Sequence, residues 1–424
     1  MATSQNHVIQ FQLSYLVDIH ENYNDMIRET ILPLHPYRED PFLIVDLGII
    51  SRQYQRWKRN FPTITPYYAI KCNPDKNILA LLNDLGCGFD VASKTEIATV
   101  LDLGVDPNRI IFANPCKYIQ HVDYARNHNV DLLVVDSPAE LHKIRFHHSE
   151  ARILIRIKID DSKSMCPFST KFGVDMCDVK SLLLLAKQLR LNVCGVSFHV
   201  GSNCQDETAY KSAIANCKTV FQMAREPDVG INMHILDIGG GFPAGNKTDV
   251  VSFETIAKTI HDSINEYFGE EKNQIQFIAE PGRYFVASSH TLICTIINRK
   301  DRREGGYIYY ISDGAYGTFS GGVFDHAKYE FIPCTPRSSS HTRFPSTVFG
   351  PTCDSLDVVV KDYPLPLLDI GEKLMVRNIG AYSTASGTEF NGFTTPLRQY
   401  IKTEIMSDEP EYPLSERHHK CCLC

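Results

Sequence analysis

Short apolar runs alternate with amphipathic segments between about residues 65 and 280. The runs number eight, each four to seven residues long and rich in Val, Ile, Phe or Tyr: PYYAIK, GFDVA, IIFAN, DLLVVD, RILIRIK, CGVSFHV, HILDIGG and IQFIAE. Such runs are typical of parallel strands buried on both faces. Segments between them, such as KNILALLNDLG and VKSLLLLAKQLRL, place apolar residues at helical spacing, and several follow a Ser, Thr or Asp suited to cap a helix.

This alternation predicts a (β/α)8 barrel over residues 44–284, because parallel strands need crossover helices to connect them. A doubly wound open sheet is the alternative architecture. The number of strands and the placement of polar residues at their ends favour the barrel.

The pattern changes after Arg283. Six runs, among them TLICTIINRK, GYIYYISD and EKLMVRNI, read as strands separated by turns, with no long helical pattern between them. We therefore expect a second, all-β domain over 285–424, ending in a loose tail. Residues 1–43 lie outside the barrel pattern, and their segment HVIQFQLSY is expected to add a strand to the β domain.

Composition excludes several classes of protein. With 43% hydrophobic and 22% charged residues and a net charge of -7, the chain reads as a globular protein without the basic surface of a nucleic-acid binder. We find no secretion signal and no apolar stretch long enough to span a membrane. The 14 cysteines are scattered, which favours free thiols in a reducing compartment and a cytoplasmic location.

The final residues, HHKCCLC, place His418 and His419 beside a Cys421-x-x-Cys424 pair. A metal site would need a second pair of ligands at a set spacing, and a lipidation box does not usually end in Cys. We expect a loose, thiol-rich tail and no bound metal.

Unusual polar residues stand at the ends of four predicted strands. Lys71 ends the first, His199 the sixth and Glu280 the eighth, while Gly239–Gly241 follow the seventh. In a barrel these positions share the face at the carboxyl ends of the strands, where barrel active sites form. Pro281, Gly282 and Arg283 follow Glu280 directly.

These residue types together point to pyridoxal phosphate (PLP). Glycine backbone and Arg283 suit a phosphate, although a glycine triplet without such neighbours is more often a flexible turn. A desolvated Lys71 would be a nucleophile able to form a Schiff base, against the alternative of a lysine at the barrel rim that reaches into solvent. Glu280 could hold a proton on the pyridine nitrogen, and His199 could stack on the ring.

The sequence resembles the eukaryotic ornithine decarboxylases, a branch of the alanine-racemase-like PLP-dependent decarboxylases. The resemblance runs from about residue 42 to 400 and is carried by PYYAIKCN, FDVASKTEI, IIFANPCK, KFGV, GVSFHVGS, LDIGGGFP, AEPGRYFVAS, DGAYGTF, FDHA, GPTCDSLD and GAY…FNGF. It implies decarboxylation of L-ornithine to putrescine, with Lys71 carrying the cofactor and Asp90 and Arg156 lining it. The phosphate would be held by Ser202, Gly241, Gly282, Arg283 and Tyr382.

The resemblance also implies a homodimer with shared active sites. Cys353 would return a proton to the substrate's Cα after carbon dioxide leaves. Phe324, Asp325 and Asp354 would form the pocket for the distal amine, and Lys171 and Asp357 would pair across the interface.

The distal-amine segment departs from the family. Gly321 and Gly322 stand where bulkier residues are usual, and Phe324 replaces Tyr, so we expect a roomier pocket in which lysine competes with ornithine. The segment Lys117–Glu140 matches the family's binding region for antizyme, but several charges differ, with Asp123 among them. Binding to antizyme therefore stays open.

Four other assignments compete with an ornithine decarboxylase. An antizyme-inhibitor-like binding protein of the same fold is one, but the retained Lys71, Cys353 and Asp354 favour an active enzyme. A small single-domain PLP protein lacks the second domain. Arginine and diaminopimelate decarboxylases are the enzyme alternatives, and Asp325 weighs against a distal zwitterion such as that of diaminopimelate.

Overall fold

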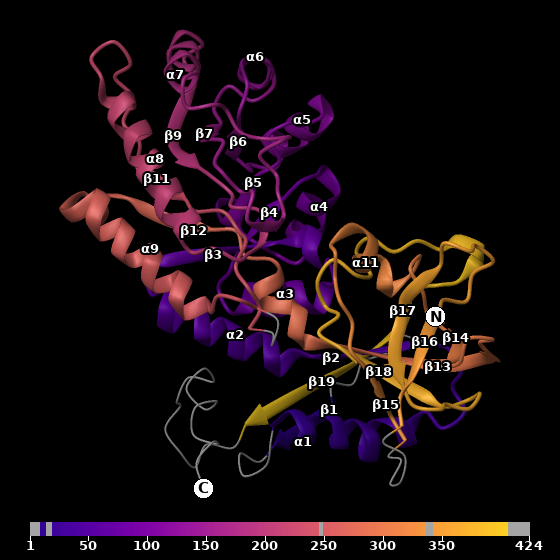
Figure 1. Ribbon diagram of the computed structural model, residues 1–424. Helices are drawn as coiled ribbons and strands as arrows, with labels where there is room; N and C mark the ends of the chain where they lie inside the picture. Colours follow the sequence, from indigo (N-terminus) through magenta and orange to yellow (C-terminus); the bar gives the residue numbers. More distant parts are fainter. Residues whose placement is uncertain (1–8, 14–18, 246–248, 336–341, 406–424) are drawn as a thin grey trace, which may run out of the picture. The chain divides into compact units, whose positions relative to one another are not determined.

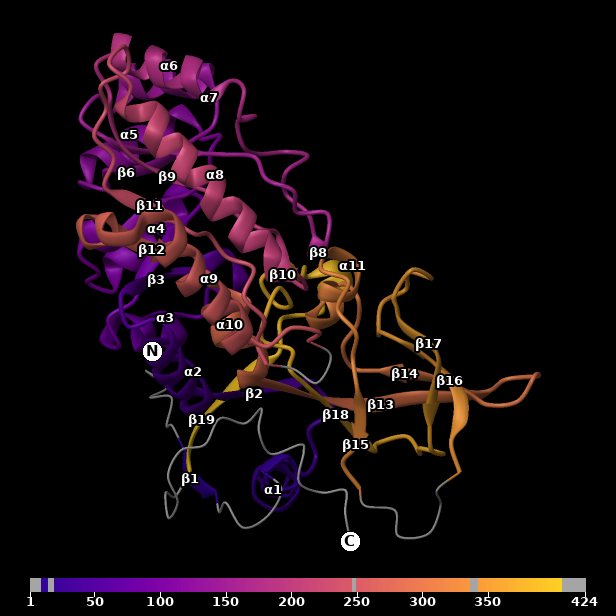
Figure 2. The same cartoon turned by 60° about the vertical axis from the view of Figure 1, so that its left-hand side comes forward.

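The computed structural model describes residues 9–13, 19–245, 249–335 and 342–405. The chain divides into two compact units, whose elements are labelled in Figure 1 and seen from another side in Figure 2. The barrel unit is continuous and comprises Ser51–Val286, whereas the sheet unit combines Met1–Ile50 with Ala287–Cys424. The tail that contains Cys421 and Cys424 lies outside the described residues.

Eight parallel strands close the barrel, in the order β11-β12-β3-β4-β5-β6-β7-β9. They are β3 (Ile64–Ala69), β4 (Gly88–Val91), β5 (Ile110–Phe112), β6 (Leu132–Val135), β7 (Arg152–Arg156), β9 (Asn192–Ser197), β11 (Ile235–Asp237) and β12 (Gln276–Ala279). Each predicted run overlaps one of these strands, although β3 and β9 each begin two residues before the run that predicted them. The predicted barrel is therefore confirmed, and the open sheet is wrong.

Alternating strand positions fill the barrel interior. Apolar side chains from most of the eight strands form one buried cluster, which includes Tyr67, Ile111, Leu132, Leu154, Ile235 and Ile278. The strands are short because only three to six residues pass through this layer before the chain turns outward. The residues at their carboxyl ends are thereby fixed by a packed core.

Helices connect the strands. They are α2 (Leu47–Asn60), α3 (Lys76–Asp84), α4 (Lys94–Asp102), α5 (Ile119–Asn127), α6 (Pro138–His147), α7 (Val179–Gln188), α8 (Thr208–Arg225), α9 (Phe253–Phe268) and α10 (Arg283–Val286). Three of the predicted caps are present: Asp75, Ser93 and Ser252 each accept hydrogen bonds from backbone N–H groups in the first turn of α3, α4 and α9. Ser137 before α6 and Asp178 before α7 make no such side-chain bond, so a cap is wrong at these two positions.

The two ends of the barrel segment are tied together. Gln53 Nε2 donates to the Tyr284 carbonyl at 2.8 Å, and the Tyr284 hydroxyl donates back to the Gln53 carbonyl at 3.0 Å. Next to them the chain's single tryptophan, Trp57, is fully buried and donates to the Ile64 carbonyl. Its ring lies within an aromatic cluster that includes Phe242, 5.0 Å away between ring centroids.

The sheet unit is built on nine strands. They are β1 (Ile9–Leu13), β2 (Phe42–Asp46), β13 (His290–Asp301), β14 (Tyr307–Ile311), β15 (Phe331–Pro333), β16 (Phe344–Phe349), β17 (Val358–Leu365), β18 (Lys373–Arg377) and β19 (Leu397–Ile405). The main path runs β1-β19-β2-β13-β14-β16-β17, with β18 between β13 and β15. A separate β-sheet unit after the barrel is thus confirmed.

Both ends of the chain enter this sheet. The predicted N-terminal strand is present as β1, which pairs in parallel with β19 so that Ile9 faces Ile401. Strand β2, which we did not predict, lies between β19 and β13. The helix α1 (Ile19–Met26) and the helical turns after it pack Tyr23, Ile27 and Ile31 into the core of the sheet unit.

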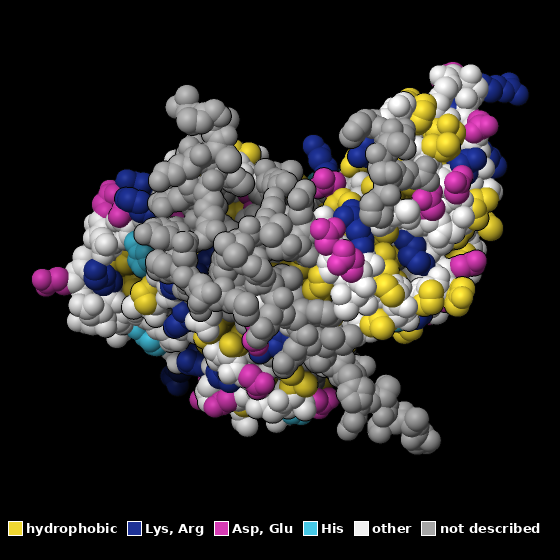
Figure 3. Space-filling model, turned by 90° about the horizontal axis from the view of Figure 1, so that it is seen from below, with side chains coloured by type: hydrophobic (Ala, Val, Ile, Leu, Met, Phe, Trp, Pro, Cys, Tyr) yellow, Lys and Arg dark blue, Asp and Glu magenta, His cyan; other side chains and the backbone are white. Residues whose placement is uncertain are grey.

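Charged groups of both signs intermingle on the face shown in Figure 3. Exposed ion pairs link neighbouring helices, as Lys211 of α8 does with Glu266 of α9 at 2.9 Å. Each such pair contributes about 0–1 kcal/mol, so the cores carry the fold. Within the described residues no helix combines the length and apolar character needed to cross a bilayer.

Candidate active site at the carboxyl ends of the barrel strands

Lys71 lies in the turn that directly follows β3. Its ammonium group forms an ion pair with Asp90 at the end of β4, and the Asp90 side chain is 1% exposed. The Lys71 side chain itself is 41% exposed, and its desolvation in the cofactor-bound protein stays a prediction. The charge of Asp90, not burial, is the local feature that orients the Lys71 nitrogen.

Glu280 and Asp237 are buried carboxyl groups on neighbouring strands. Burial raises the pKa of Glu280 well above its ordinary value, and the charges of Asp237 and Asp90 raise it further. Burial likewise raises the pKa of Asp237 to about 7, although its Oδ1 accepts the Gly239 N–H at 2.9 Å. Asp237 was not predicted as a site residue, but an acid inside an apolar strand is a signal that could have found it.

Among the described residues, Glu280 has an oxygen without a hydrogen-bond partner and a buried arginine, Arg156, as its neighbour. Within the described part of the chain, Glu280 Oε1 is buried without a hydrogen-bond partner. Arg156, at the end of β7, has a pKa lowered by burial, which the neighbouring carboxylates of Glu280 and Asp136 oppose. The site therefore holds a carboxyl group ready to share a proton with a buried basic atom.

His199 is held as a neutral ring. Its pKa is lowered well below the usual value, first by burial and then by the positive charges of Arg156 and Lys71. Its Nδ1 accepts the Gly201 N–H at 3.0 Å, so the ring proton is placed on Nε2. A neutral imidazole in this setting presents a flat face without adding charge to the site.

The glycine triplet approaches its neighbours too closely for any side chain. A Cβ on Gly239 would lie 2.1 Å from the Phe198 carbonyl oxygen, and one on Gly240 would lie 2.8 Å from His199 Nε2. A Cβ on Gly241 would lie 2.6 Å from the Gly201 oxygen. The three glycines thus form a cradle of bare backbone beside His199.

Serine and arginine complete one side of this cradle. Ser202 begins the short strand β10 (Ser202–Cys204), which pairs with β8 (Ser164–Cys166). Arg283 Nη2 donates to Ser202 Oγ at 2.9 Å. The carbonyl of Pro281 accepts the Ala69 N–H at 3.1 Å, so the segment Glu280–Arg283 is also tied to the strand that leads to Lys71.

Two predicted site residues that follow one another in the chain, Cys353 and Asp354, belong to the sheet unit. Asp354 accepts a hydrogen bond from the Tyr316 hydroxyl, and the Cys353 N–H donates to Asn391 Oδ1 at 2.9 Å. The Cys353 side chain is exposed. Tyr316 and Asn391 were not predicted, because neither stands out in sequence without its partner.

The remaining predicted residues are spread over both units. Asp325 is 4% exposed, Phe324 is 68% exposed, and Tyr382 has a left-handed backbone with φ of 52°. Lys171 Nζ in the barrel unit lies 5.0 Å from the Phe172 ring centroid. Asp357 is buried and accepts hydrogen bonds within the sheet unit.

Gly321 and Gly322 do not leave open space in the distal-amine segment. A Cβ on Gly321 would lie 3.1 Å from the Tyr329 hydroxyl, and one on Gly322 would lie 3.4 Å from the Tyr329 ring. Tyr329 donates to the Phe319 carbonyl at 3.2 Å and packs edge-on against the Phe319 ring. On this side of the short helix α11 (Gly321–Phe324) both glycines therefore lie beside Tyr329, and a roomier pocket for the distal amine stays a prediction.

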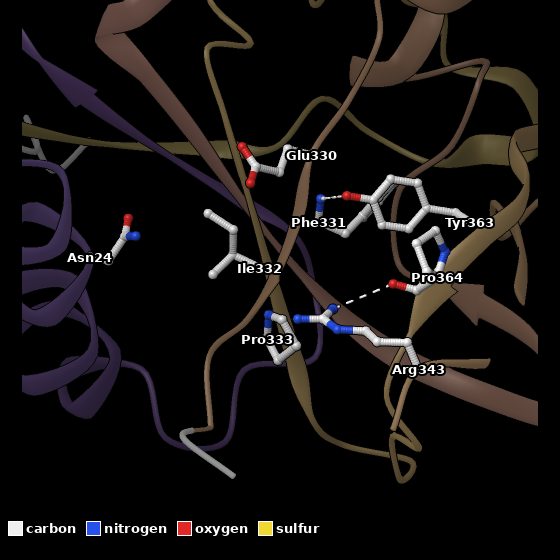
Figure 4. Close-up of a pocket in the computed structure, with 8 residues that line it drawn as sticks. All are labelled: Asn24, Glu330, Phe331, Ile332, Pro333, Arg343, Tyr363 and Pro364. Atoms are coloured by element: carbon white, nitrogen blue, oxygen red, sulfur yellow. Dashed lines mark hydrogen bonds between the residues drawn. The ribbon is translucent and has the colours of Figure 1, made fainter. Parts of the chain in front are cut away.

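A pocket of about 490 Å³ opens in the sheet unit (Figure 4). It is lined by Asn24, Glu330, Phe331, Ile332, Pro333, Arg343, Tyr363 and Pro364. None of these is a predicted site residue. The Tyr363 hydroxyl accepts the Phe331 N–H at 3.2 Å, so part of the wall is used to cap a strand.

The chain is similar to curated decarboxylases along most of its length. It is 44% identical over 378 residues to a probable ornithine decarboxylase of Dictyostelium discoideum, covering 86% of this chain and 80% of that protein. It is also 43% identical over 365 residues to antizyme inhibitor 2 of Xenopus laevis, covering 84% and 79%.

Solved structures give the same picture. The arginine decarboxylase of Paramecium bursaria Chlorella virus superposes with a TM-score of 0.83 at 34% identity, covering 90% of this chain and 100% of that one. The lysine/ornithine decarboxylase of Vibrio vulnificus complexed with putrescine gives 0.79 at 30% identity, covering 89% and 98%.

The residues present fit pyridoxal phosphate. The glycine cradle with Ser202 and Arg283 offers donors for a phosphate, and the unpartnered oxygen of Glu280 suits a pyridine nitrogen. The family model of the pyridoxal-dependent decarboxylases, in its pyridoxal-binding domain, matches residues 47–287. A closed barrel, this set of residues at its strand ends and the matched relatives agree, and the chain belongs to the pyridoxal-dependent decarboxylases.

Proposed function

We propose that this protein decarboxylates L-ornithine to putrescine and carbon dioxide, the entry step of polyamine synthesis. Relatives named ornithine decarboxylase support the substrate, at 40–44% identity over more than four fifths of the chain. The observation that carries the chemistry is the joint presence of the Lys71–Asp90 ion pair, the buried Glu280 and the Ser202–Arg283 contact at the strand ends.

Each barrel residue then has a definite task. Lys71 would hold the cofactor by its aldehyde carbon, and Ser202, Arg283 and the glycines 239–241 and 282 would hold its phosphate. When bound, pyridoxal phosphate supplies an electron-accepting ring that stabilises the charge left on Cα as carbon dioxide departs. Glu280 would keep a proton on the ring nitrogen, and the neutral His199 would lie against the ring face.

The sheet unit supplies the groups proposed to act on the substrate. Cys353 would return a proton to Cα, and Asp325 and Asp354 would bind the distal ammonium group, because a second cation calls for carboxylates. Tyr382 is assigned to the phosphate by family resemblance.

We also propose a homodimer whose active sites are shared, with Lys171 and Asp357 at its interface, on the same resemblance. Free thiols at the described cysteines support a reducing, cytoplasmic location. The similarity to antizyme inhibitor 2 supports antizyme as a partner for the segment Lys117–Glu140.

The test is cofactor-dependent release of carbon dioxide from L-ornithine, L-lysine, L-arginine and meso-diaminopimelate by the purified protein. We expect ornithine to react fastest. Lys71→Ala should abolish turnover, while Lys76→Ala, which changes an exposed lysine at the start of α3, should leave it intact. Turnover that survives in Lys71→Ala would refute the assigned role.

A binding protein that resembles antizyme inhibitor is the second candidate, favoured by the Xenopus relative. It would bind antizyme and turn over none of the four amino acids, even as a cofactor-loaded dimer. The lysine rate in the same assay decides how strictly the enzyme selects ornithine.

A further inference from the structure

Asp357 connects two loops of the sheet unit. It is 1% exposed and directly precedes β17 in the chain. Its Oδ1 accepts the Ala315 N–H at 2.7 Å, while its Oδ2 accepts the Thr352 N–H at 3.0 Å and the Thr352 hydroxyl at 2.7 Å. One carboxylate thus holds the backbone of both loops by charge-assisted hydrogen bonds.

Two glycines make room for this carboxylate. A Cβ on Gly314 would lie 2.2 Å from Asp357 Oδ1, and one on Gly350 would lie 2.3 Å from the same atom. Neither glycine has a left-handed backbone, so space and not conformation explains them. The first glycine of DGAYG and the glycine of FGPTC are therefore explained by the buried Asp357 carboxylate that lies against both of them.

The two loops carry residues proposed for the reaction. The first contains Tyr316, whose hydroxyl donates to Asp354 in the second. Thr352 Oγ1 accepts the Asp354 N–H at 3.4 Å, and Asp357 N–H donates to the Asp354 carbonyl at 3.1 Å. Cys353 lies between Thr352 and Asp354, with its own N–H held by Asn391.

A third segment joins the same arrangement. The Thr388 N–H donates to the Tyr316 carbonyl at 2.7 Å, and the Tyr316 ring stacks on Phe390 with 4.6 Å between centroids. The Tyr316 loop therefore contacts the Cys353–Asp354 loop and also the segment 388–391, whose Asn391 accepts the Cys353 N–H. Asp357 is the group that joins the first two through buried bonds.

We propose that Asp357 is a positioning residue that holds the Cys353–Asp354 loop against the Tyr316 loop, independently of any ion pair with Lys171. The proposal rests on the proposed function only in that Cys353 and Asp354 act on the substrate. The contacts themselves lie within one chain.

The test is Asp357→Asn in the full-length protein loaded with cofactor. Asparagine has the size and shape of aspartate, but one of its two terminal groups is an NH2 donor. That group would face either the Ala315 N–H or the Thr352 N–H, so the hydrogen bond to one of the two loops is lost. We expect amide hydrogen exchange in peptides covering 313–319 and 350–356 to accelerate about tenfold, in line with the loss of bonds to a charged acceptor. The kcat for ornithine should fall with little change in cofactor absorbance, since the barrel residues are untouched.

Three further variants decide the interpretation. Asp362→Asn changes an exposed acid on β17, 68% exposed, and should alter neither measurement. Thr352→Val removes the hydroxyl's bond to Asp357 and the long 3.4 Å bond that it accepts from the Asp354 N–H, and it should give a smaller acceleration in 350–356, even if Asp357→Asn does not fold. Lys171→Met should leave exchange in both loops unchanged.

Two results would overturn the proposal. One is unchanged loop exchange in both Asp357→Asn and Thr352→Val. The other is acceleration by Lys171→Met equal to that of Asp357→Asn, which would mean that the acid acts through an interface pair. Failure of the proposed function shows differently, as a wild-type protein without turnover whose loop exchange still depends on Asp357.

Discussion

Replacing Gly239 by alanine should weaken the barrel more than a matched glycine elsewhere in the same unit. Gly239 has φ of 63°, and its missing Cβ would lie 2.1 Å from the Phe198 carbonyl oxygen and 2.9 Å from His199 Cα. Gly104, just after α4, has φ of 78°, yet nothing lies within 4 Å of its missing Cβ. Both glycines have a left-handed backbone, but only Gly239 lacks room for a side chain.

The magnitudes follow from this difference. A left-handed backbone costs an alanine about 1–2 kcal/mol, which is the whole expected loss for Gly104→Ala. Overpacking adds about 1–3 kcal/mol at Gly239, because the obstructing atoms belong to the backbone and cannot rotate away. Gly239→Ala should therefore lose roughly 2–5 kcal/mol. It should also displace His199, so cofactor affinity should fall in this variant only.

Trp57 makes the assay specific to the barrel unit. It is the chain's single tryptophan and is fully buried there, so its fluorescence in urea follows the unfolding of this unit. A pyridoxal phosphate titration of each variant gives the affinity. Equal stability losses for Gly239→Ala and Gly104→Ala, or wild-type cofactor affinity in Gly239→Ala, would refute the reasoning.

Three other predictions follow from buried contacts. Burial raises the pKa of Asp237 to about 7, so the stability that its neutral form gives the cofactor-free protein is lost as the pH rises through 7. Asp237→Asn should reduce the loss of stability between pH 5 and pH 8 in urea unfolding and leave the part that belongs to Glu280, whereas a pH profile identical to that of the wild type would contradict this. Gly322→Ile should destabilise the wild-type protein more than it destabilises a Tyr329→Val protein, with a difference of about 1 kcal/mol between the two losses in thermal unfolding. Equal losses in the two backgrounds would show that the new side chain does not meet Tyr329. Asp46→Ala should cost about 3 kcal/mol in thermal unfolding, because the buried N–H groups of Gly48 and Thr403 lose their acceptor. The control Asp369→Ala, at an exposed ion pair, should change stability by less than about 0.5 kcal/mol.

The barrel could be predicted because its signal is repeated and local. Every strand shows the continuous apolar run that two-sided burial demands, and most active-site residues stand directly at the ends of those runs. Helix α8 has a weaker sequence signal, although Tyr210, Ile214, Cys217 and Phe221 recur on its buried face at helical spacing. Alanine and cysteine dilute that stripe, so hydrophobicity alone understates it.

Long-range pairings could not be predicted from the same patterns. The ion pair between Lys71 and Asp90 joins residues nineteen positions apart, and no pattern of apolar residues marks it. Nor does the sequence show that Tyr329 lies beside Gly322, 3.4 Å from where a Cβ would be. Asp357 is likewise an unremarkable loop acid in sequence, and its role depends on Ala315, forty-two positions away.

The division of the sheet unit between the two ends of the chain sets an order of events during synthesis. Strands β1 and β2 leave the ribosome before the barrel segment, whereas β19, which pairs with both, leaves after it. The continuous barrel segment can complete its fold in the meantime, since domains fold as units during translation. Once folded, it holds Gln53 beside Tyr284 and so replaces a long flexible loop by a short fixed span. A barrel that folds first therefore lowers the loop-closure entropy that the pairing of β2 with the later strands would otherwise cost.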